Sequence, residues 1–216
     1  MALNINGTTG ISGVDGSVSA PAVTGTDSNT GITFPSADTI KFSTGGVERM
    51  SITNSGVSGI TAGITMQDSW VITANASVNS EADITSNWAK HSAGTSHTGN
   101  IGTGMTESSG IFTFPSTGIY FVTSTIVAMA GGGRTYIGMR QKFTSDGSNF
   151  TENITGYTNA YQNSAYGSVT IIGVYDVTNT STHKIKFQHN LSDTVLLIGG
   201  ASQKHTGVTF TRLGDT

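Results

Sequence analysis

The segment SSGIFTFPSTGIYFVTSTI, residues 108–126, contains the strongest fold signal in the chain. It predicts a short strand, a Pro-Ser-Thr-Gly turn and then a long strand that continues to Met129. Pro115 fixes its own φ angle and lacks an amide donor, and Gly118 permits the chain to reverse. The segment therefore predicts a tight turn between two strands of an antiparallel sheet.

The long strand carries apolar side chains on both of its faces. The two alternating sets are Ile119, Phe121, Val127 and Met129 on one face, and Tyr120, Val122, Ile126 and Ala128 on the other. A sheet with one wet face would instead alternate apolar and polar residues. We therefore expect an opposing sheet to cover one face and another subunit to cover the other.

The composition favours an all-β protein. The 216 residues suit one domain plus an extension, and 35% of them are hydrophobic, which is enough for a core. Only 11% are charged, against about 25% in ordinary globular domains. Gly, Ser, Thr and Asn replace the missing charges, which favours many short strands and turns over long helices.

Several classes of partner and site lack a signal in the sequence. A net charge of -3 without a basic cluster gives no electrostatic footprint for nucleic acid. The absence of cysteine excludes disulfides and thiolate metal sites. No segment approaches the roughly 20 apolar residues of a membrane span. We expect neither nucleic-acid binding nor membrane insertion.

Residues 1–65 differ in composition from residues 66–216. No Lys or Arg precedes Lys41, and turn dipeptides recur through this region. Residues 39–43 and 47–53 flank Thr-Gly-Gly and predict one hairpin, which alone is marginal in water. Residues 1–65 are therefore predicted to form an extended N-terminal β arm for attachment or assembly. Residues 66–216 are predicted to form a β-sandwich for trimerisation and display.

The motif GIFTFPSTGIYFV, residues 110–122, resembles the G-x-F-x-x-P-x-x-G-x-Y-x-F signature of the superfamily containing complement globular heads and tumour necrosis factor. Residues 168–177 and 207–214 resemble its late apolar strand and its closing strand. The resemblance covers residues 67–214. It implies a jelly-roll β-sandwich that forms a tight homotrimer for binding rather than catalysis. The candidates for the trimer interface or the core are Tyr120, Val122, Ile126 and Phe210.

Residues 25–52, GTDSNTGITFPSADTIKFSTGGVERMSI, resemble N-terminal segments of structural proteins of tailed bacteriophages, notably marine cyanobacterial ones. The shared elements are G-I-x-F-P and T-G-G-V-x-R-M-x-I. The resemblance implies a virion protein that assembles in the host cytoplasm. An N-terminus without the basic and apolar regions of a secretory signal agrees with that expectation.

Residues 150–166 contain the strongest binding candidate. Tyrosine rings offer contact area, and neighbouring amides pair with hydroxyl groups, a combination that suits sugar or protein recognition. The alternative is that the tyrosines pack in the trimer interface, where this residue type is common. The candidate receptor or interface residues are Tyr157, Asn159, Tyr161, Asn163 and Tyr166.

The sequence carries no catalytic or metal-binding motif. No nucleophile elbow of the G-x-S-x-G type occurs. The histidines lack H-x-x-x-H spacing, and we expect no metal and no cofactor. They are His91, His97, His183, His189 and His205.

These features predict a non-enzymatic virion structural protein, a homotrimeric capsid decoration or short-fibre protein. Residues 1–65 would anchor it to other virion proteins, and a host-surface glycan or protein would be a further partner. One alternative is a glycan-binding receptor protein at a tail-fibre tip. A polysaccharide depolymerase is another, although such spikes usually need a repeated solenoid that the sequence lacks. A secreted adhesion or signalling module of a cell is a third.

Overall fold

The structure is a computed structural model that describes residues 4–6, 10–12, 15–59, 63–91, 100–132 and 135–216. All regular elements in these ranges are β-strands. The chain divides into two compact units, Met1–Ala62 and Gly63–Thr216.

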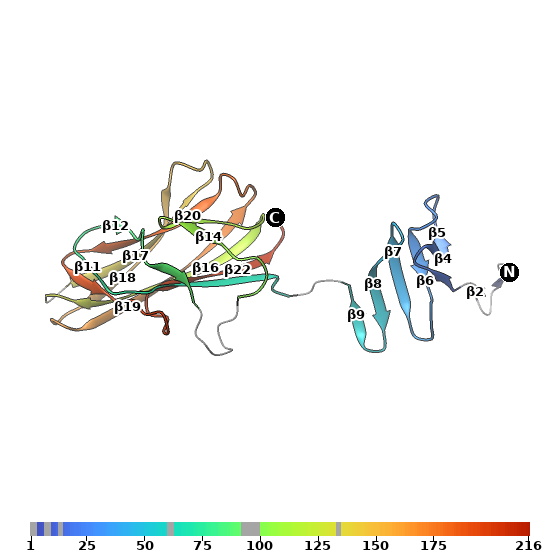
Figure 1. The fold of residues 1–216 in the computed structure, drawn as a ribbon, viewed down its shortest axis with the longest axis horizontal. Helices are drawn as coiled ribbons and strands as arrows, with labels where there is room; N and C mark the ends of the chain where they lie inside the picture. Colours follow the sequence, from blue (N-terminus) through green and yellow to red (C-terminus); the bar gives the residue numbers. More distant parts are fainter. Residues whose placement is uncertain (1–3, 7–9, 13–14, 60–62, 92–99, 133–134) are drawn as a thin grey trace. The chain divides into compact units, whose positions relative to one another are not determined.

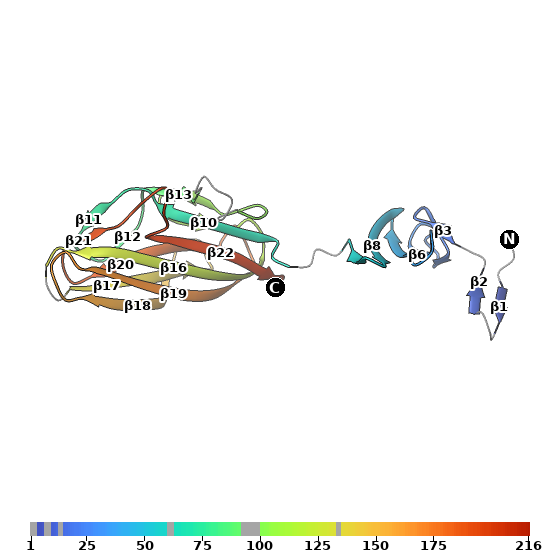
Figure 2. The ribbon, with the colours of Figure 1, turned by 90° about the horizontal axis from the view of Figure 1, so that it is seen from below.

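The larger unit is a sandwich of two antiparallel sheets (Figure 1). The first sheet has the order β11 (Ala76–Val78), β21 (Val195–Leu197), β16 (Gly118–Ala130), β22 (Gly207–Gly214), β10 (Met66–Ile72) and β13 (Trp88–Lys90), and β19 (Tyr166–Val177) also pairs with β16. The second sheet has the order β14 (Thr106–Ser108), β15 (Ile111–Thr113), β20 (Lys184–Leu191), β17 (Thr135–Thr144) and β18 (Thr151–Ala160), and β12 (Ala82–Asp83) also pairs with β20. Figure 2 shows β10, β22, β16 and β19 side by side in one layer.

Strand β16, the long strand that residues 108–126 predict, lies at the centre of the first sheet. It pairs with β19 on one edge, and with β22 and β21 on the other. Its burial alternates strictly from Gly118 to Ala130, with one face buried and the other half-buried. Gly118 has a φ of 142°, and a Cβ atom there would meet the Gly214 carbonyl oxygen at 2.5 Å. Only glycine suits that position.

Aromatic side chains dominate the core between the two sheets. Phe112, which is fully buried, lies at its centre. Its ring centroid is 5.4 Å from that of Trp70, 5.2 Å from that of Trp88 and 5.5 Å from that of Phe187. All three contacts are edge-on, an arrangement that aromatic quadrupoles favour. Phe187 and Ile185 of β20 also point into the sandwich, and both are fully buried.

A buried polar side chain links the two sheets. Gln141 of β17 is fully buried, and its amide donates to the Val122 carbonyl oxygen at 3.1 Å and to Ser124 Oγ at 3.0 Å on β16. The Tyr175 hydroxyl of β19 donates to Gln141 Oε1 at 2.7 Å. A Cβ atom at Gly173 would lie 2.4 Å from that same oxygen, so glycine makes room for the amide.

The smaller unit contains a five-stranded antiparallel meander with two short pairs of strands before it (Figure 1). The meander consists of β5 (Val23–Thr24), β6 (Gly31–Thr33), β7 (Ile40–Thr44), β8 (Val47–Thr53) and β9 (Gly56–Ser58). The short pairs are β1 (Asn4–Asn6) with β2 (Gly10–Ser12), and β3 (Gly16–Ser17) with β4 (Ala20–Pro21). The β7–β8 turn has positive φ angles at Gly45 and Gly46, which suits a tight hairpin.

Candidate functional site

The outer face of the first sheet carries an apolar surface along β16 and β19. Residues that pair directly across two antiparallel strands share a face of the sheet. Phe121 pairs with Val174, and Thr123 pairs with Ile172. We call this surface the β16–β19 face, and define it by Ile119, Phe121, Val127, Met129, Ile172 and Val174.

The β16–β19 face is accessible to solvent in the single chain. Ile172 is 52% exposed and Val174 is 60% exposed, and the four members on β16 are half-buried. Contiguous exposed apolar surface marks an interaction site more often than isolated exposed residues do. One apolar face of residues 119–129 therefore lies in the core, and the other apolar face is accessible to solvent.

The four candidates for trimer interface or core lie in the core. Tyr120, Val122 and Ile126 occupy the inner face of β16, Phe210 lies on β22, and all four are fully buried. The Tyr120 hydroxyl donates to the Ser116 carbonyl oxygen at 2.9 Å within the predicted turn. An interface through this sheet would consequently use the opposite set of side chains.

The five candidate receptor residues do not form one cluster. Tyr157 and Asn159 lie on β18, and Tyr161 and Asn163 lie in the turn before β19. Tyr166 begins β19 and pairs with Met129, which places it on the outer side of the other sheet. The structure therefore separates Tyr157 from Tyr166.

Tyr157 belongs to a group of polar and aromatic side chains on the outer face of the second sheet. We call this group the tyrosine platform, and define it by Tyr136, Arg140, Tyr157, Gln188 and Asn190. In the register of these strands, Gly138 of β17 lies opposite Tyr157 of β18 and Asn190 of β20, and Arg140 of β17 lies opposite Gln188 of β20. Strands β17, β18 and β20 thus bring these groups together from three separate parts of the sequence.

Hydrogen bonds hold the tyrosine platform in place. The Tyr157 hydroxyl accepts from Asn190 Nδ2 at 3.0 Å and from Arg140 NH2 at 3.2 Å. Arg140 NH1 donates to Gln188 Oε1 at 3.2 Å, and the Tyr136 hydroxyl donates to Asn190 Oδ1 at 3.3 Å. The rings of Tyr136 and Tyr157 meet edge to face, with centroids 5.6 Å apart.

Two carboxylates flank Arg140 at the edge of the platform. Arg140 NH1 lies 2.5 Å from Glu81 Oε1, and Arg140 Nε lies 3.2 Å from Glu152 Oε2. Burial lowers the pKa of Arg140, but the hydrogen bond with Tyr157 and the charges of Glu152 and Glu81 outweigh it and raise that pKa overall. The guanidinium is therefore a permanent cation whose charge two carboxylates already balance.

Sequence reasoning identified Tyr157 but missed most of its neighbours. Arg140 had a recognisable signal, because it alternates with apolar residues along residues 135–144 and so belongs to an outer face. Gly138 allows the Tyr157 ring to lie against β17, since a Cβ atom there would be 2.6 Å from two ring carbons. Glu81 and Asn190 lie far from Tyr157 in the sequence, and only the fold brings them close.

The smaller unit exposes apolar side chains on one side of its meander. Register places them together, with Val23 paired to Ile32 and Ile40 paired to Ile52. We call this surface the apolar arm face, and define it by Val23, Ile32, Phe34, Ile40, Phe42, Met50, Ile52 and Val57. In the described part of this unit no large apolar side chain is fully buried.

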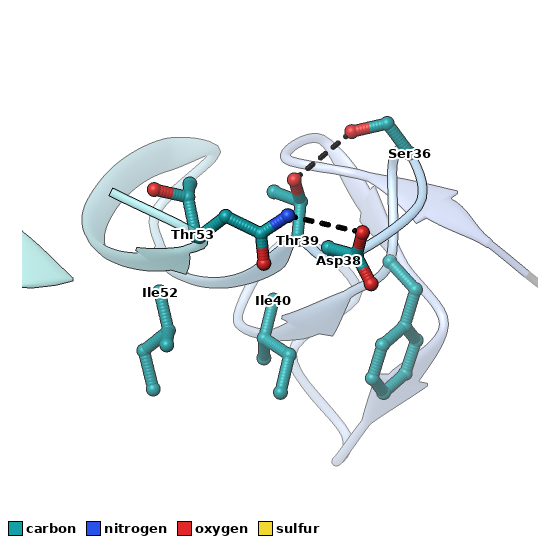
Figure 3. Close-up of a pocket in the computed structure, with 8 residues that line it drawn as sticks. Ser36, Asp38, Thr39, Ile40, Ile52 and Thr53 are labelled. Carbon is teal, nitrogen blue, oxygen red and sulfur yellow. Dashed lines mark hydrogen bonds between the residues drawn. The ribbon is translucent and has the colours of Figure 1, made fainter. Parts of the chain in front are cut away.

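An open pocket of about 410 Å³ lies at one end of the apolar arm face. Figure 3 shows Ile40 and Ile52 extending to the same side, away from Ser36. Asn54 Nδ2 donates to Asp38 Oδ2 at 3.1 Å across the mouth of the β7–β8 hairpin. The pocket therefore combines an apolar floor with a polar rim.

Histidines and acidic residues form no metal site within the described ranges. No group of three or more His, Asp or Glu side chains comes together there. His91 and His189 are buried, and burial lowers the pKa of His189. His97 lies outside the described residues. Among the described elements there is also no helix that is long and apolar enough to cross a membrane.

Comparisons with known proteins identify the fold of the larger unit. No family model and no curated protein matches the sequence. Murine APRIL matches with a TM-score of 0.51 and 15% identity, over 68% of this chain and 98% of that chain. Eiger TNF from S. frugiperda matches with a TM-score of 0.54 and 13% identity, over 71% of this chain and 96% of that chain. The PRD1 vertex protein P5 matches with a TM-score of only 0.41, which is too low to inform fold or function here.

Identities this low establish the fold alone. The chain is all-β, and its larger unit is a jelly-roll sandwich like those of tumour necrosis factor relatives, preceded by an N-terminal β arm. The motif at residues 110–122 predicted this fold, and the prediction is confirmed.

Proposed function

We propose that the chain is a homotrimeric virion structural protein without enzymatic activity, with a capsid decoration or short-fibre role. In this proposal the jelly roll trimerises through the β16–β19 face, and residues 1–65 attach it to other virion proteins. The exposed side chains of Ile172 and Val174 beside the apolar outer row of β16 carry the proposal. A solitary chain would leave this surface in water.

Closed cyclic assembly accounts for the β16–β19 face. A closed ring buries the same patch in every copy and leaves none to form open-ended aggregates. Burial of apolar area stabilises such an interface by about 25 cal/mol per Å² before the costs of association. The number of three copies comes from the resemblance of residues 110–122 to a superfamily of trimers.

The composition and surface of the arm support an attachment role. An isolated sheet without fully buried large apolar side chains gains little to offset its ordering entropy. The apolar arm face offers Phe34, Ile52 and Val57, all exposed, for burial against a partner. The virion location rests on the resemblance of residues 25–52 to arms of phage structural proteins.

The oligomeric state tests the central part of the proposal. Light scattering should give a mass of three chains of 22.3 kDa each. Val174→Glu should give monomers with an unchanged circular dichroism spectrum, because closing the interface would bury an unpaired carboxylate at a cost of several kcal/mol. Ser202→Glu, at an exposed loop position, serves as the matched control and should remain trimeric.

Two results would contradict this assignment. A parent protein that is monomeric at micromolar concentration would show that the face does not join copies of this chain. A trimer in Val174→Glu would show that assembly uses another surface.

A further inference from the structure

We propose that the tyrosine platform is a binding site for a neutral hexose unit of a glycan. The site lies on the second sheet, whereas the proposed trimer contact lies on the first. Sugar binding at this site therefore does not depend on trimer formation, and the two can be measured independently.

The platform presents a fixed and exposed aromatic ring. Tyr157 is 51% exposed, although its hydroxyl is held by Asn190 and Arg140. One side of the ring lies against the bare backbone at Gly138, and the edge-to-face contact with Tyr136 limits its rotation. The face of an aromatic ring carries partial negative charge, which suits the polarised C–H groups on one side of a pyranose ring.

Hydrogen-bonding groups lie at the hydroxyl end of this ring and around Arg140. Among the described residues the Tyr157 hydroxyl only accepts hydrogen bonds, so its own proton remains available to a ligand. The side chains of Glu81 and Glu152 are 47% and 42% exposed, respectively. Each ionised carboxylate has about four acceptor positions. Arg140, and the Thr155 hydroxyl that donates to Glu152, leave several of them free for sugar hydroxyl donors. Stacking and paired hydroxyl contacts together define a sugar subsite.

The charges favour a neutral sugar over an anionic one. Arg140 faces two carboxylates, and its side chain is only 15% exposed. Lys186, the next cation along β20, pairs with Asp83 at 2.7 Å. An incoming carboxylate, sulfate or phosphate would thus meet no unpaired cation at Arg140 or Lys186. Lys142, the next outward residue of β17, is half-buried and lies opposite the Glu152 carboxylate in the strand register. A neutral hexose requires no such cation.

The chemistry of the platform favours a sugar over a protein partner. Cores of protein interfaces are depleted of charged residues, whereas here Arg140 bonds to the hydroxyl of the exposed ring and pairs with two carboxylates. Protein anchors also require a pocket for an aromatic or Arg side chain, and the platform is a sheet surface. Three platforms in one trimer would raise the avidity for a multivalent glycan by roughly 10²–10⁴ over a single site.

The test uses saturation-transfer NMR on the full chain with the methyl pyranosides of glucose, galactose and mannose, and with sialic acid as the anionic probe. At least one neutral pyranoside should bind, and sialic acid should bind more weakly. Tyr157→Ala should weaken binding about ten-fold or more, since it removes the stacking surface and a hydroxyl together. Tyr161→Ala is the matched control, because this tyrosine is exposed in the turn before β19, and it should bind as the parent does.

Melting curves of both variants ensure that a loss of binding is not a loss of folding. Tyr157→Phe, which keeps the ring, should retain part of the affinity even if Tyr157→Ala is unstable. The proposal is overturned if no neutral pyranoside binds, if sialic acid binds more tightly, or if Tyr157→Ala binds like the parent. Capture of a protein by this surface without sugar binding would assign it to a protein partner instead. Light scattering on the same samples reports separately on the trimer.

Discussion

Replacing Gln141 tests whether the polar link between the two sheets stabilises the jelly roll. The amide of this fully buried side chain joins β17 to β16, and its oxygen receives the Tyr175 hydroxyl. Gln141→Leu keeps a side chain of similar volume but removes every one of these contacts. The hydroxyls of Tyr175 and Ser124 would lose their Gln141 partner inside the core.

The expected loss follows from the groups left without that partner. A buried donor or acceptor without a partner costs about 1–3 kcal/mol. Burial raises the pKa of Tyr175, so its hydroxyl stays protonated and still requires an acceptor. Gln141→Leu should therefore lower the free energy of unfolding by about 2–4 kcal/mol. Tyr175→Phe in the Leu variant removes one orphaned group and should recover about 1 kcal/mol or more.

Urea titrations of the parent, both single variants and the double variant measure these differences. All four proteins are compared at one chain concentration, because oligomerisation makes apparent stability depend on concentration. A coupling free energy of about 0.5–3 kcal/mol between the two positions is expected for residues in contact. A Leu variant as stable as the parent, or strictly additive effects of the two changes, would refute the inter-sheet link.

Phe187→Ala should lower the free energy of unfolding by about 3–5 kcal/mol, because the ring is fully buried against Phe112; an unchanged urea midpoint would show that the register of β20 is wrong. Since burial lowers the pKa of His189, the unfolded chain binds a proton more readily below about pH 6.5, and stability should fall from pH 7 to pH 5. His189→Gln should show a shallower fall. Deletion of residues 1–62 should leave a folded trimer with nearly the parent melting temperature, but the shortened protein should be absent from purified virus particles. Full incorporation of the shortened protein into particles would show that the jelly roll itself is the anchor.

The sequence was sufficient where the signal was local and periodic. The Pro-Ser-Thr-Gly turn and the apolar run after it predicted the strand and its two apolar faces, and the burial of residues 118–130 alternates along those faces without interruption. The hairpin of the arm was also predicted within one residue at its first strand, since Thr-Gly-Gly lies between two alternating runs. Such features depend only on neighbours along the chain.

The missing features depend on contacts between distant residues. Gln141 is polar and sits among apolar residues of β17, and its role becomes visible only when β16 and β19 supply its partners. The run of tyrosines was interpreted as one surface because the turn at Ser164, where φ is 65°, was not recognised. That turn sends Tyr166 to the other sheet, where it pairs with β16.

The two outer faces of the sandwich differ in chemistry, and this difference supports separate roles for them. Outward residues of β16 and β19 are mostly apolar, and their polar members are chiefly hydroxyls such as Thr125 and Thr170, which bond to each other at 2.8 Å. Outward residues of β17 and β20 instead form the charged network around Arg140. A surface of the first kind gains free energy when a second copy removes it from water. When a protein covers a surface of the second kind, the charged groups lose their hydration, which costs free energy. Such a surface therefore serves better for a small polar ligand that leaves most of those charges hydrated.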